Sequence, residues 1–183
     1  YDIRGVVGSN INQNTAYTIG RTFAYTVINR LKSNIIATGY DGRLTSPDLH
    51  KSLCEGLKDS GAKVINIGMG PTPMTYFAHY HLNADAAIMV TGSHNPSEYN
   101  GFKMVLNKHS FYAEDIQSLQ KLIDQNDLKL IEGEIINQDI KKDYNERLLQ
   151  NINLNKKIKI AWDIGNGAMG TVIKEVTNNL NYL

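Results

Sequence analysis

Three short apolar segments, separated by stretches with helical periodicity, place the strongest constraint on what this chain can fold into. They span residues 34–38, 63–67 and 84–90. Each is a nearly continuous apolar run, which is typical of strands buried on both faces of a sheet. Strands and helices that alternate in this way form βαβ units with right-handed crossovers. The sequence therefore predicts an α/β fold, with a mainly parallel, mixed sheet and helices on both faces.

Helical patterns precede and separate these segments. Residues 14–31 carry apolar or small side chains along one helical stripe. Two further helices are predicted to begin at the proline-containing caps Ser46-Pro47 and Thr72-Pro73. We expect the aromatic side chains of the last of these helices to lie in the core: Tyr76, Phe77 and Tyr80.

The second half of the chain continues the first domain. A further strand is predicted at residues 102–106, followed by amphipathic helices near 112–125 and 138–152. The Asn/Asp/Gly-rich stretch between these two helices is expected to be a loop. Residues 1–152 would then form one domain.

Residues 153–183 are expected to begin a second, similar domain. A strand is predicted at residues 158–163, followed by a glycine turn and a final helix. One strand and one helix cannot bury a core of their own. This part of the chain is therefore expected to be the truncated start of a second domain, and the whole chain an N-terminal fragment.

The charge balance argues against several classes of partner. The chain has 19 Lys and Arg residues against 18 Asp and Glu residues, a net charge of +1. Without a basic field, nucleic acid is not an expected ligand. No run of residues is long and apolar enough to predict a membrane span. The single cysteine, Cys54, cannot form an internal disulfide, so we expect a cytoplasmic protein.

The loop at residues 91–96 carries the chemistry that the sequence offers. It follows the most apolar predicted strand, and ligands of parallel sheets bind beyond the carboxyl ends of strands. Ser93 and His94 lie side by side in it. A serine oxygen in this position can act as a nucleophile or hold a phosphoryl group. Because Asn95 replaces the second glycine of a Gly-x-Ser-x-Gly elbow, acyl transfer is disfavoured.

Phosphoryl transfer needs positive charge around the transferred group. Lys103 supplies one cation downstream of the serine loop. Arg4 supplies another if a first strand lies alongside.

Motifs in three separate parts of the chain support this interpretation together. They are Tyr1-Asp2-Ile3-Arg4-Gly5, Gly39-Tyr40-Asp41-Gly42-Arg43 with Ser46-Pro47, and Thr91-Gly92-Ser93-His94-Asn95-Pro96 with Tyr99-Asn100-Gly101-Phe102-Lys103. In this order they resemble the α-D-phosphohexomutase superfamily, and the serine loop is most similar to its phosphomannomutase/phosphoglucomutase branch. The resemblance implies the fold of domain I of that superfamily.

The resemblance also implies roles for individual residues. Ser93 would carry the transferred phosphoryl group. His94, Lys103 and Arg4 would be the other catalytic residues. Tyr1, Asn95 and Asn100 would contact the substrate, and Arg43 is expected to bond the carbonyl groups of the turn.

The activity implied is the interconversion of hexose 1-phosphate and hexose 6-phosphate, with mannose or glucose as the sugar. A phosphorylated Ser93 would donate its group, and hexose 1,6-bisphosphate would be the intermediate and activator. The implied cofactor is Mg²⁺, held by an oxygen of the phosphorylated Ser93 and by aspartates outside this chain. The remaining domains of the same protein would be its partners, and the fragment alone would be inactive.

Three alternatives remain open on the sequence. A phosphoglucosamine mutase would share these motifs. A non-catalytic domain for sugar-phosphate binding or assembly would leave Ser93 unphosphorylated. A dinucleotide-binding protein is suggested by Gly165–Gly170, which fits Gly-x-Gly-x-x-Gly after a predicted strand.

Overall fold

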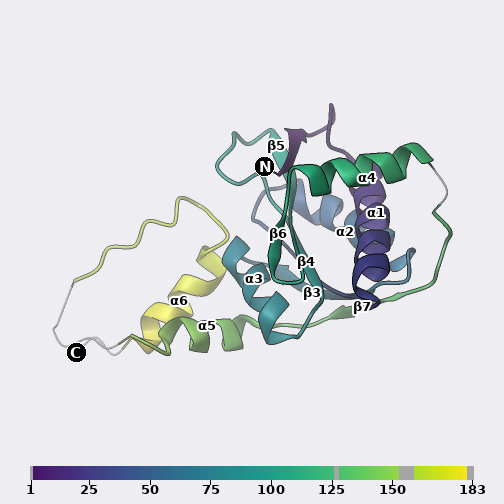
Figure 1. Ribbon diagram of the computed structural model, residues 1–183. Coiled ribbons are helices and arrows are strands. Elements are labelled where there is room, and N and C mark those ends of the chain that lie inside the picture. The colour runs from purple at the N-terminus through teal and green to yellow at the C-terminus, as the bar shows by residue number, and fades with distance from the viewer. Residues whose placement is uncertain (1, 126–127, 153–158, 181–183) are drawn as a thin grey trace.

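The computed structural model describes residues 2–125, 128–152 and 159–180. Strands and helices alternate through most of it (Figure 1). The strands are β1 (Ile3–Val6), β2 (Ile35–Tyr40), β3 (Lys63–Met69), β4 (Ala86–Val90), β5 (Tyr99–Leu106), β6 (His109–Phe111) and β7 (Glu134–Asn137). The helices are α1 (Gln13–Leu31), α2 (Ser46–Lys58), α3 (Thr72–His81), α4 (Glu114–Gln125), α5 (Lys141–Leu149) and α6 (Gly170–Asn179).

All described strands belong to one seven-stranded mixed sheet, in the order β1-β5-β4-β2-β3-β7, with β6 on β5. The half formed by β4, β2, β3 and β7 is parallel. The other half is antiparallel, because β5 runs against β1, β4 and β6. The α/β class and the mixed sheet are confirmed, and the antiparallel half brings β1 next to β5.

Helices cover both faces of the sheet, as predicted (Figure 1). One apolar cluster joins α1, α2 and α4 to one face, with Phe23 and Leu53 fully buried. The other joins α3, α5 and α6 to the opposite face, around Met74 and Ile140. Burial of these side chains supplies most of the driving force for the layered arrangement.

Helices α1 and α2 pack with their backbones in close contact. A methyl group at Gly20 would collide with the carbonyl oxygen of Leu53, and one at Gly56 with that of Tyr17. Glycine at both positions removes the side chains that would hold the helices apart. Asn12 caps the first turn of α1 by accepting a hydrogen bond of 2.9 Å from the Thr15 amide. These contacts fix the helix layer behind β2 and β4.

Three strands lie outside the predicted set or in a region predicted as loop. β7 lies in the stretch expected to be a loop, and it pairs in parallel with the edge strand β3. Its residues are mostly exposed, and its sequence does not have the long apolar run that marks the inner strands. β6 is a short strand in a hairpin with β5. β1 pairs with β5, so the first strand lies alongside the strand that carries Lys103, as was required for Arg4 to be near the site.

The predicted strand at residues 158–163 is not observed. Residue 158 lies outside the described residues, and residues 159–164 form no strand. The side chains of Ile160 and Trp162 are 41% and 51% exposed. A strand forms only by pairing with a neighbour, and no described strand pairs with this segment. The helix expected after it is present as α6.

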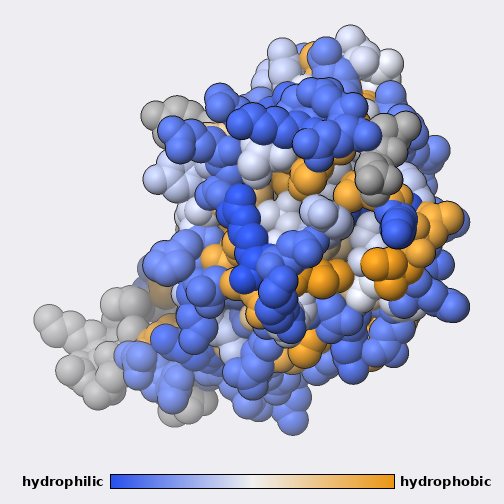
Figure 2. Space-filling model, turned by 45° about the vertical axis from the view of Figure 1, so that its right-hand side comes forward, coloured by the Kyte–Doolittle hydropathy of each residue, from blue (hydrophilic) through white to orange (hydrophobic). Residues whose placement is uncertain are grey.

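The aromatic residues of α3 are not all in the core. Tyr76 is 37% exposed and Tyr80 is 55% exposed, so the prediction that they are core residues was wrong. Phe77 packs against the cluster on its face of the sheet. The face of the molecule in Figure 2 is mainly hydrophilic, with apolar side chains in separate patches. Among the described helices, none has the length and apolar character needed to cross a bilayer.

Candidate active site

A cavity of about 930 Å³ opens at the carboxyl ends of the parallel strands. Segments that follow β2, β3 and β4 line it at residues 41–45, 71–76 and 91–97, and β5 contributes Lys103. This is the edge at which parallel sheets bind ligands. The predicted position of the site is the position of this cavity.

Ser93 lies on the wall of the cavity in an unusual backbone conformation. Its φ of 53° is left-handed, which a residue with a side chain adopts only under local constraint. The Ser93 amide donates to Thr91 Oγ1 at 2.8 Å, and the Asn95 amide donates to the Gly92 carbonyl at 3.1 Å. Ser93 is half-buried, and its Oγ lies 3.4 Å from His94 Nδ1. The hydroxyl is thus held at the cavity, with an imidazole beside it.

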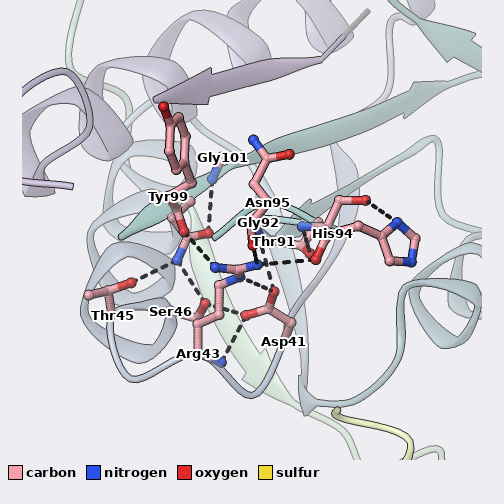
Figure 3. Close-up of polar contacts among 12 residues, drawn as sticks. Asp41, Arg43, Thr45, Ser46, Thr91, Gly92, His94, Asn95, Tyr99 and Gly101 are labelled. Carbon is pink, nitrogen blue, oxygen red and sulfur yellow. Dashed lines mark hydrogen bonds and ion pairs between the residues drawn. The ribbon is translucent and has the colours of Figure 1, made fainter. Parts of the chain in front are cut away.

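The serine loop is held from below by the guanidinium of Arg43 (Figure 3). Arg43 Nη1 donates to the carbonyls of Pro96 and Tyr99 at 2.6 and 3.0 Å. Nη2 donates to those of Ser93 and Asn95 at 3.1 and 2.6 Å. The expected bonding of turn carbonyls by Arg43 is therefore confirmed, and this side chain is committed to the loop rather than free to bind a ligand.

Asp41 connects the serine loop to the start of α2. One carboxylate oxygen accepts hydrogen bonds from the Arg43 amide at 3.0 Å and from Ser46 Oγ at 2.6 Å. The other accepts from the Gly92 amide at 3.2 Å and lies 3.4 Å from Arg43 Nε. Ser46, expected to cap α2, uses its hydroxyl for Asp41 instead. The sequence motif contained Asp41, but nothing in its pattern distinguished this role.

Asn100 lies beneath the same network. It is fully buried, and its amide nitrogen donates to Thr45 Oγ1 and Ser46 Oγ, both at 2.9 Å. Its amide oxygen accepts from the Gly101 amide at 2.9 Å. All polar atoms of this side chain are used inside the protein. The expectation that Asn100 contacts the substrate is at odds with this burial, and its contacts give it a structural role.

The two predicted cations lie at the β1–β5 edge and share a partner. Arg4 Nη2 and Lys103 Nζ lie 2.8 and 2.7 Å from the same oxygen, Oδ2 of Asp2. Arg4 Nη1 also donates to Asn95 Oδ1 at 3.3 Å, which connects this edge to the serine loop. Of the predicted residues, Ser93, His94, Asn95 and Lys103 line the cavity. Tyr1 lies outside the described residues.

Sequence reasoning missed Asp2 and Tyr76. Burial, the largest influence, raises the pKa of Asp2, but hydrogen bonds from Lys103 and Arg4 outweigh it, so this pKa lies below its ordinary value. Burial raises the pKa of Tyr76, and the negative charge of Asp2 raises it further. Tyr76 lines the cavity. Its exposure was hidden in the sequence because α3 has aromatic residues on more than one face.

The described residues do not form a metal site by themselves. They hold no group of three or more His, Cys, Asp or Glu side chains that could bind a metal ion. Asp41, the carboxylate that accepts a hydrogen bond from the Gly92 amide of the serine loop, is already bonded to Arg43 and Ser46 as well. The described residues therefore do not supply a complete set of metal ligands by themselves.

The glycine turn before α6 also lines the cavity, at residues 165–168. Gly165 and Asn166 have φ values of 53° and 57°. A dinucleotide fingerprint requires a strand directly before such a turn, and residues 159–164 form none. The turn belongs to the same cavity as Ser93 and lacks the context of a nucleotide site in the described residues.

The fold and the loop define an α/β domain that presents a serine at the carboxyl edge of its sheet. The chain belongs to the phosphoglucomutase/phosphomannomutase family, since residues 1–130 match its alpha/beta/alpha domain I.

Relatives and solved structures agree with this assignment. The chain is 40% identical over 180 residues to a phosphomannomutase/phosphoglucomutase of Pseudomonas aeruginosa, covering 98% of this chain and 39% of that protein. It is 40% identical over 172 residues to a phosphoglucomutase of Neisseria meningitidis, covering 93% and 37%. A family structure from Burkholderia thailandensis superposes with a TM-score of 0.90 at 36% identity, covering 97% of this chain and 40% of that one. The chain thus spans about two fifths of the length of these proteins.

Proposed function

We propose that this chain is the phosphoserine domain of an enzyme that interconverts hexose 1-phosphate and hexose 6-phosphate, with mannose or glucose as the sugar. The observation that carries the proposal is the position of Ser93. Its hydroxyl lies on the wall of a cavity that also contains Lys103 and His94. The family membership of the chain and the names of its relatives support the same reaction.

In the proposed reaction, phosphorylated Ser93 faces the free hydroxyl of a bound hexose monophosphate. The hydroxyl oxygen forms a new bond to phosphorus as the Ser93 Oγ–phosphorus bond breaks. The hydroxyl proton leaves to a base, and the departing Ser93 Oγ takes up a proton to become a free hydroxyl again. The product is a hexose 1,6-bisphosphate. The reverse transfer, from the other end of the sugar, restores phosphorylated Ser93 and releases the isomeric monophosphate.

The charge of the site supports a need for cations from elsewhere. Arg4, Arg43 and Lys103 carry three positive charges, and Asp2 and Asp41 carry two negative ones, which leaves a net of one positive charge. A phosphoserine brings about two negative charges, and the substrate brings its own phosphate. We therefore propose that Mg²⁺, held by aspartates outside this chain, and further domains of the protein supply the missing positive charge.

The test uses the full-length protein that contains this chain. We expect it to convert mannose 1-phosphate or glucose 1-phosphate to the 6-phosphate, and Ser93→Ala to abolish the conversion. Ser97→Ala is the matched control, since Ser97 lies in the same loop and its hydroxyl contacts only Glu98 among the described residues. Activity in Ser93→Ala equal to that of the wild type would refute the proposal.

Two measurements separate this reaction from its alternatives. Rates with glucosamine phosphate, compared with those with glucose 1-phosphate, distinguish a phosphoglucosamine mutase from the proposed enzyme. Intact mass of the full-length protein distinguishes a non-catalytic binding domain. We expect one phosphate on the peptide that contains Ser93, and a binding domain would carry none.

The proposed substrate and location follow from the same reaction. Hexose phosphates are the proposed ligands, and neither nucleic acid nor a membrane takes part. The single thiol, Cys54, is buried within α2 and in contact with Thr38. We propose a cytoplasmic location, where thiols stay reduced.

A further inference from the structure

One carboxylate holds both of the cations expected to act on the phosphoryl group. Oδ2 of Asp2 lies 2.8 Å from Arg4 Nη2 and 2.7 Å from Lys103 Nζ. The side chains of Asp2 and Lys103 are each 21% exposed, so this pair is partly shielded from water. Shielding strengthens the attraction relative to an ion pair on the open surface.

The backbone around this group is closely fitted. β1 and β5 pair in antiparallel register, with Arg4 opposite Gly101. A methyl group at Gly101 would collide with the carbonyl oxygen of Ile3, so the two strands approach more closely than side chains would allow. Asp2 directly precedes β1, and Lys103 lies two residues beyond Gly101 on β5. The backbone positions of Asp2, Arg4 and Lys103 are therefore fixed by the pairing of β1 with β5.

The same group reaches the serine loop and the wall of the cavity. Arg4 Nη1 donates to Asn95 Oδ1 at 3.3 Å, two residues from Ser93. Lys103 itself lines the cavity. Tyr76 also lines the cavity. Burial raises the pKa of Tyr76 most, and the negative charge of Asp2 raises it further. Asp2 therefore contacts Arg4 and Lys103 directly and acts on Tyr76 through its charge.

We propose that Asp2 is a positioning residue for phosphoryl transfer. It fixes the distance between the Arg4 guanidinium and the Lys103 ammonium, and it cancels one of their two positive charges. This inference rests on the proposed function of Ser93. The pKa of Asp2 lies below its ordinary value because Lys103 and Arg4 outweigh its burial, so the carboxylate is ionised at neutral pH.

This role predicts that loss of the Asp2 charge lowers kcat but strengthens the binding of phosphate groups, which lowers KM. Without the charge of Asp2, the cavity carries one more net positive charge and binds phosphate groups more tightly. The neutral amide of Asp2→Asn accepts weaker hydrogen bonds than the carboxylate does, so Lys103 and Arg4 are held less firmly in their positions. A misplacement of about 1 Å in a catalytic group lowers the rate by about a hundredfold. A carboxylate with a merely structural role would weaken binding and turnover together.

The experiment measures kcat and KM of the full-length enzyme carrying Asp2→Asn, with glucose 1-phosphate as substrate. We expect kcat to fall by about tenfold to a hundredfold and KM to fall by about fivefold. Inorganic phosphate, measured as a competitive inhibitor, should bind more tightly by a similar factor. Glu98→Gln is the matched control, because it removes a carboxylate near the serine loop whose only described side-chain partner is Ser97.

Asp2→Glu separates charge from position. It keeps the charge, so we expect a KM close to that of the wild type, with kcat between the wild type and Asp2→Asn. An unchanged kcat in Asp2→Asn, or a KM that rises with the loss of kcat, would overturn the inference. If Asp2→Asn did not fold, a fall in KM for Asp2→Glu would overturn it as well.

The inference and the function on which it rests fail in different ways. Full activity in Ser93→Ala would refute the function itself. An inactive Ser93→Ala beside an Asp2→Asn variant with wild-type constants would refute only the role of Asp2.

Discussion

Arg43 and Gly92 lie so close together that no side chain fits between them. A methyl group at Gly92 would overlap Nε and Cζ of the Arg43 guanidinium and lie 2.7 Å from the Tyr99 carbonyl oxygen. From this position Arg43 reaches three carbonyl groups of the serine loop and that of Tyr99 at the start of β5. The glycine before Ser93 is thus required by the arginine beneath it, and the two residues together define the shape of the loop.

Gly92→Ala is expected to displace Arg43 from the loop and to reduce phosphorylation of Ser93. Overpacking of a well-packed site costs about 1–3 kcal/mol, and we expect a loss of this size in the free energy of unfolding. Urea denaturation measures the stability, and intact mass measures the phosphate on the full-length protein.

Gly42→Ala is the control for this substitution. Gly42 lines the same cavity, but a methyl group there meets its nearest atom, the amide nitrogen of Ala168, at 3.8 Å, an ordinary contact. We expect wild-type stability and phosphorylation in this variant. Equal losses at both positions would mean that the contact with Arg43 is not the cause.

Arg43→Lys is expected to loosen the serine loop although it keeps the positive charge. A lysine ammonium is a compact point charge and cannot span four carbonyls as a planar guanidinium does. The Arg43 side chain is 17% exposed. We expect the free energy of unfolding to fall by about 2 kcal/mol, the value of lost hydrogen bonds to a charged group. Amide hydrogen exchange at residues 92–95 should become faster.

Arg30→Lys provides the comparison for Arg43→Lys. Arg30 pairs with Asp115 at 2.6 Å, and the two side chains are 42% and 37% exposed. Exposed pairs contribute less than about 1 kcal/mol. A stability loss in Arg30→Lys as large as that in Arg43→Lys would contradict the special role of the carbonyl contacts.

Acid is expected to destabilise the fold through His50. Burial lowers the pKa of His50 from 6.5 to about 4, and its ring lies 3.1 Å from Thr38 Oγ1 and against Cys54. Above pH 6.5 the histidine is neutral in both states. Between pH 6.5 and about 4 only the unfolded chain takes up a proton on this histidine. The free energy of unfolding therefore decreases as the pH is lowered through this range. The total loss is about 3 kcal/mol.

His50→Gln removes this titration. Urea denaturation at pH values from about 7 down to about 5 should give a flatter dependence for the variant than for the wild type. A smaller slope will remain, because burial also lowers the pKa of His79. Identical slopes for the two proteins would show that the pKa of His50 does not differ between the folded and unfolded states.

The inner strands and their helices were predictable because burial leaves a periodic trace in the sequence. β4 is a continuous apolar run and β2 a nearly continuous one, and the loop after β4 has its own glycine and proline. β7 leaves no such trace, since it is an exposed edge strand stabilised by pairing with β3. Residues 159–164 do have a strand-like pattern but no described partner, which shows that pattern alone does not form a strand.

The position of the cavity, at the carboxyl ends of the parallel strands, was predictable from the sequence, but the side-chain contacts around it were not. Ser93, His94 and Lys103 line the cavity because antiparallel pairing places Lys103 of β5 opposite Met89, near the carboxyl end of β4. The contact of Asp2 with Lys103 spans 101 positions in sequence, and no local pattern encodes it. Local sequence likewise could not tell Asn95, on the cavity wall, from the buried Asn100.

The two asparagines should therefore respond differently to substitution. Asn100→Ala removes three hydrogen bonds of a fully buried side chain and leaves the Thr45 and Ser46 hydroxyls without that partner. We expect a loss of about 2–3 kcal/mol in the free energy of unfolding.

Asn95→Ala removes one bond of 3.3 Å to Arg4 on the cavity wall. We expect it to change stability by less than about 1 kcal/mol and to raise KM for glucose 1-phosphate in the full-length enzyme. Urea denaturation and steady-state kinetics on both variants test the distinction between Asn95 and Asn100. A raised KM in Asn100→Ala with wild-type stability would mean that Asn100 contacts the substrate, against its burial in this structure. The hydrogen bonds of Asn100 to the start of α2 imply the opposite result, because they support Asp41 and, through it, the loop that holds Ser93.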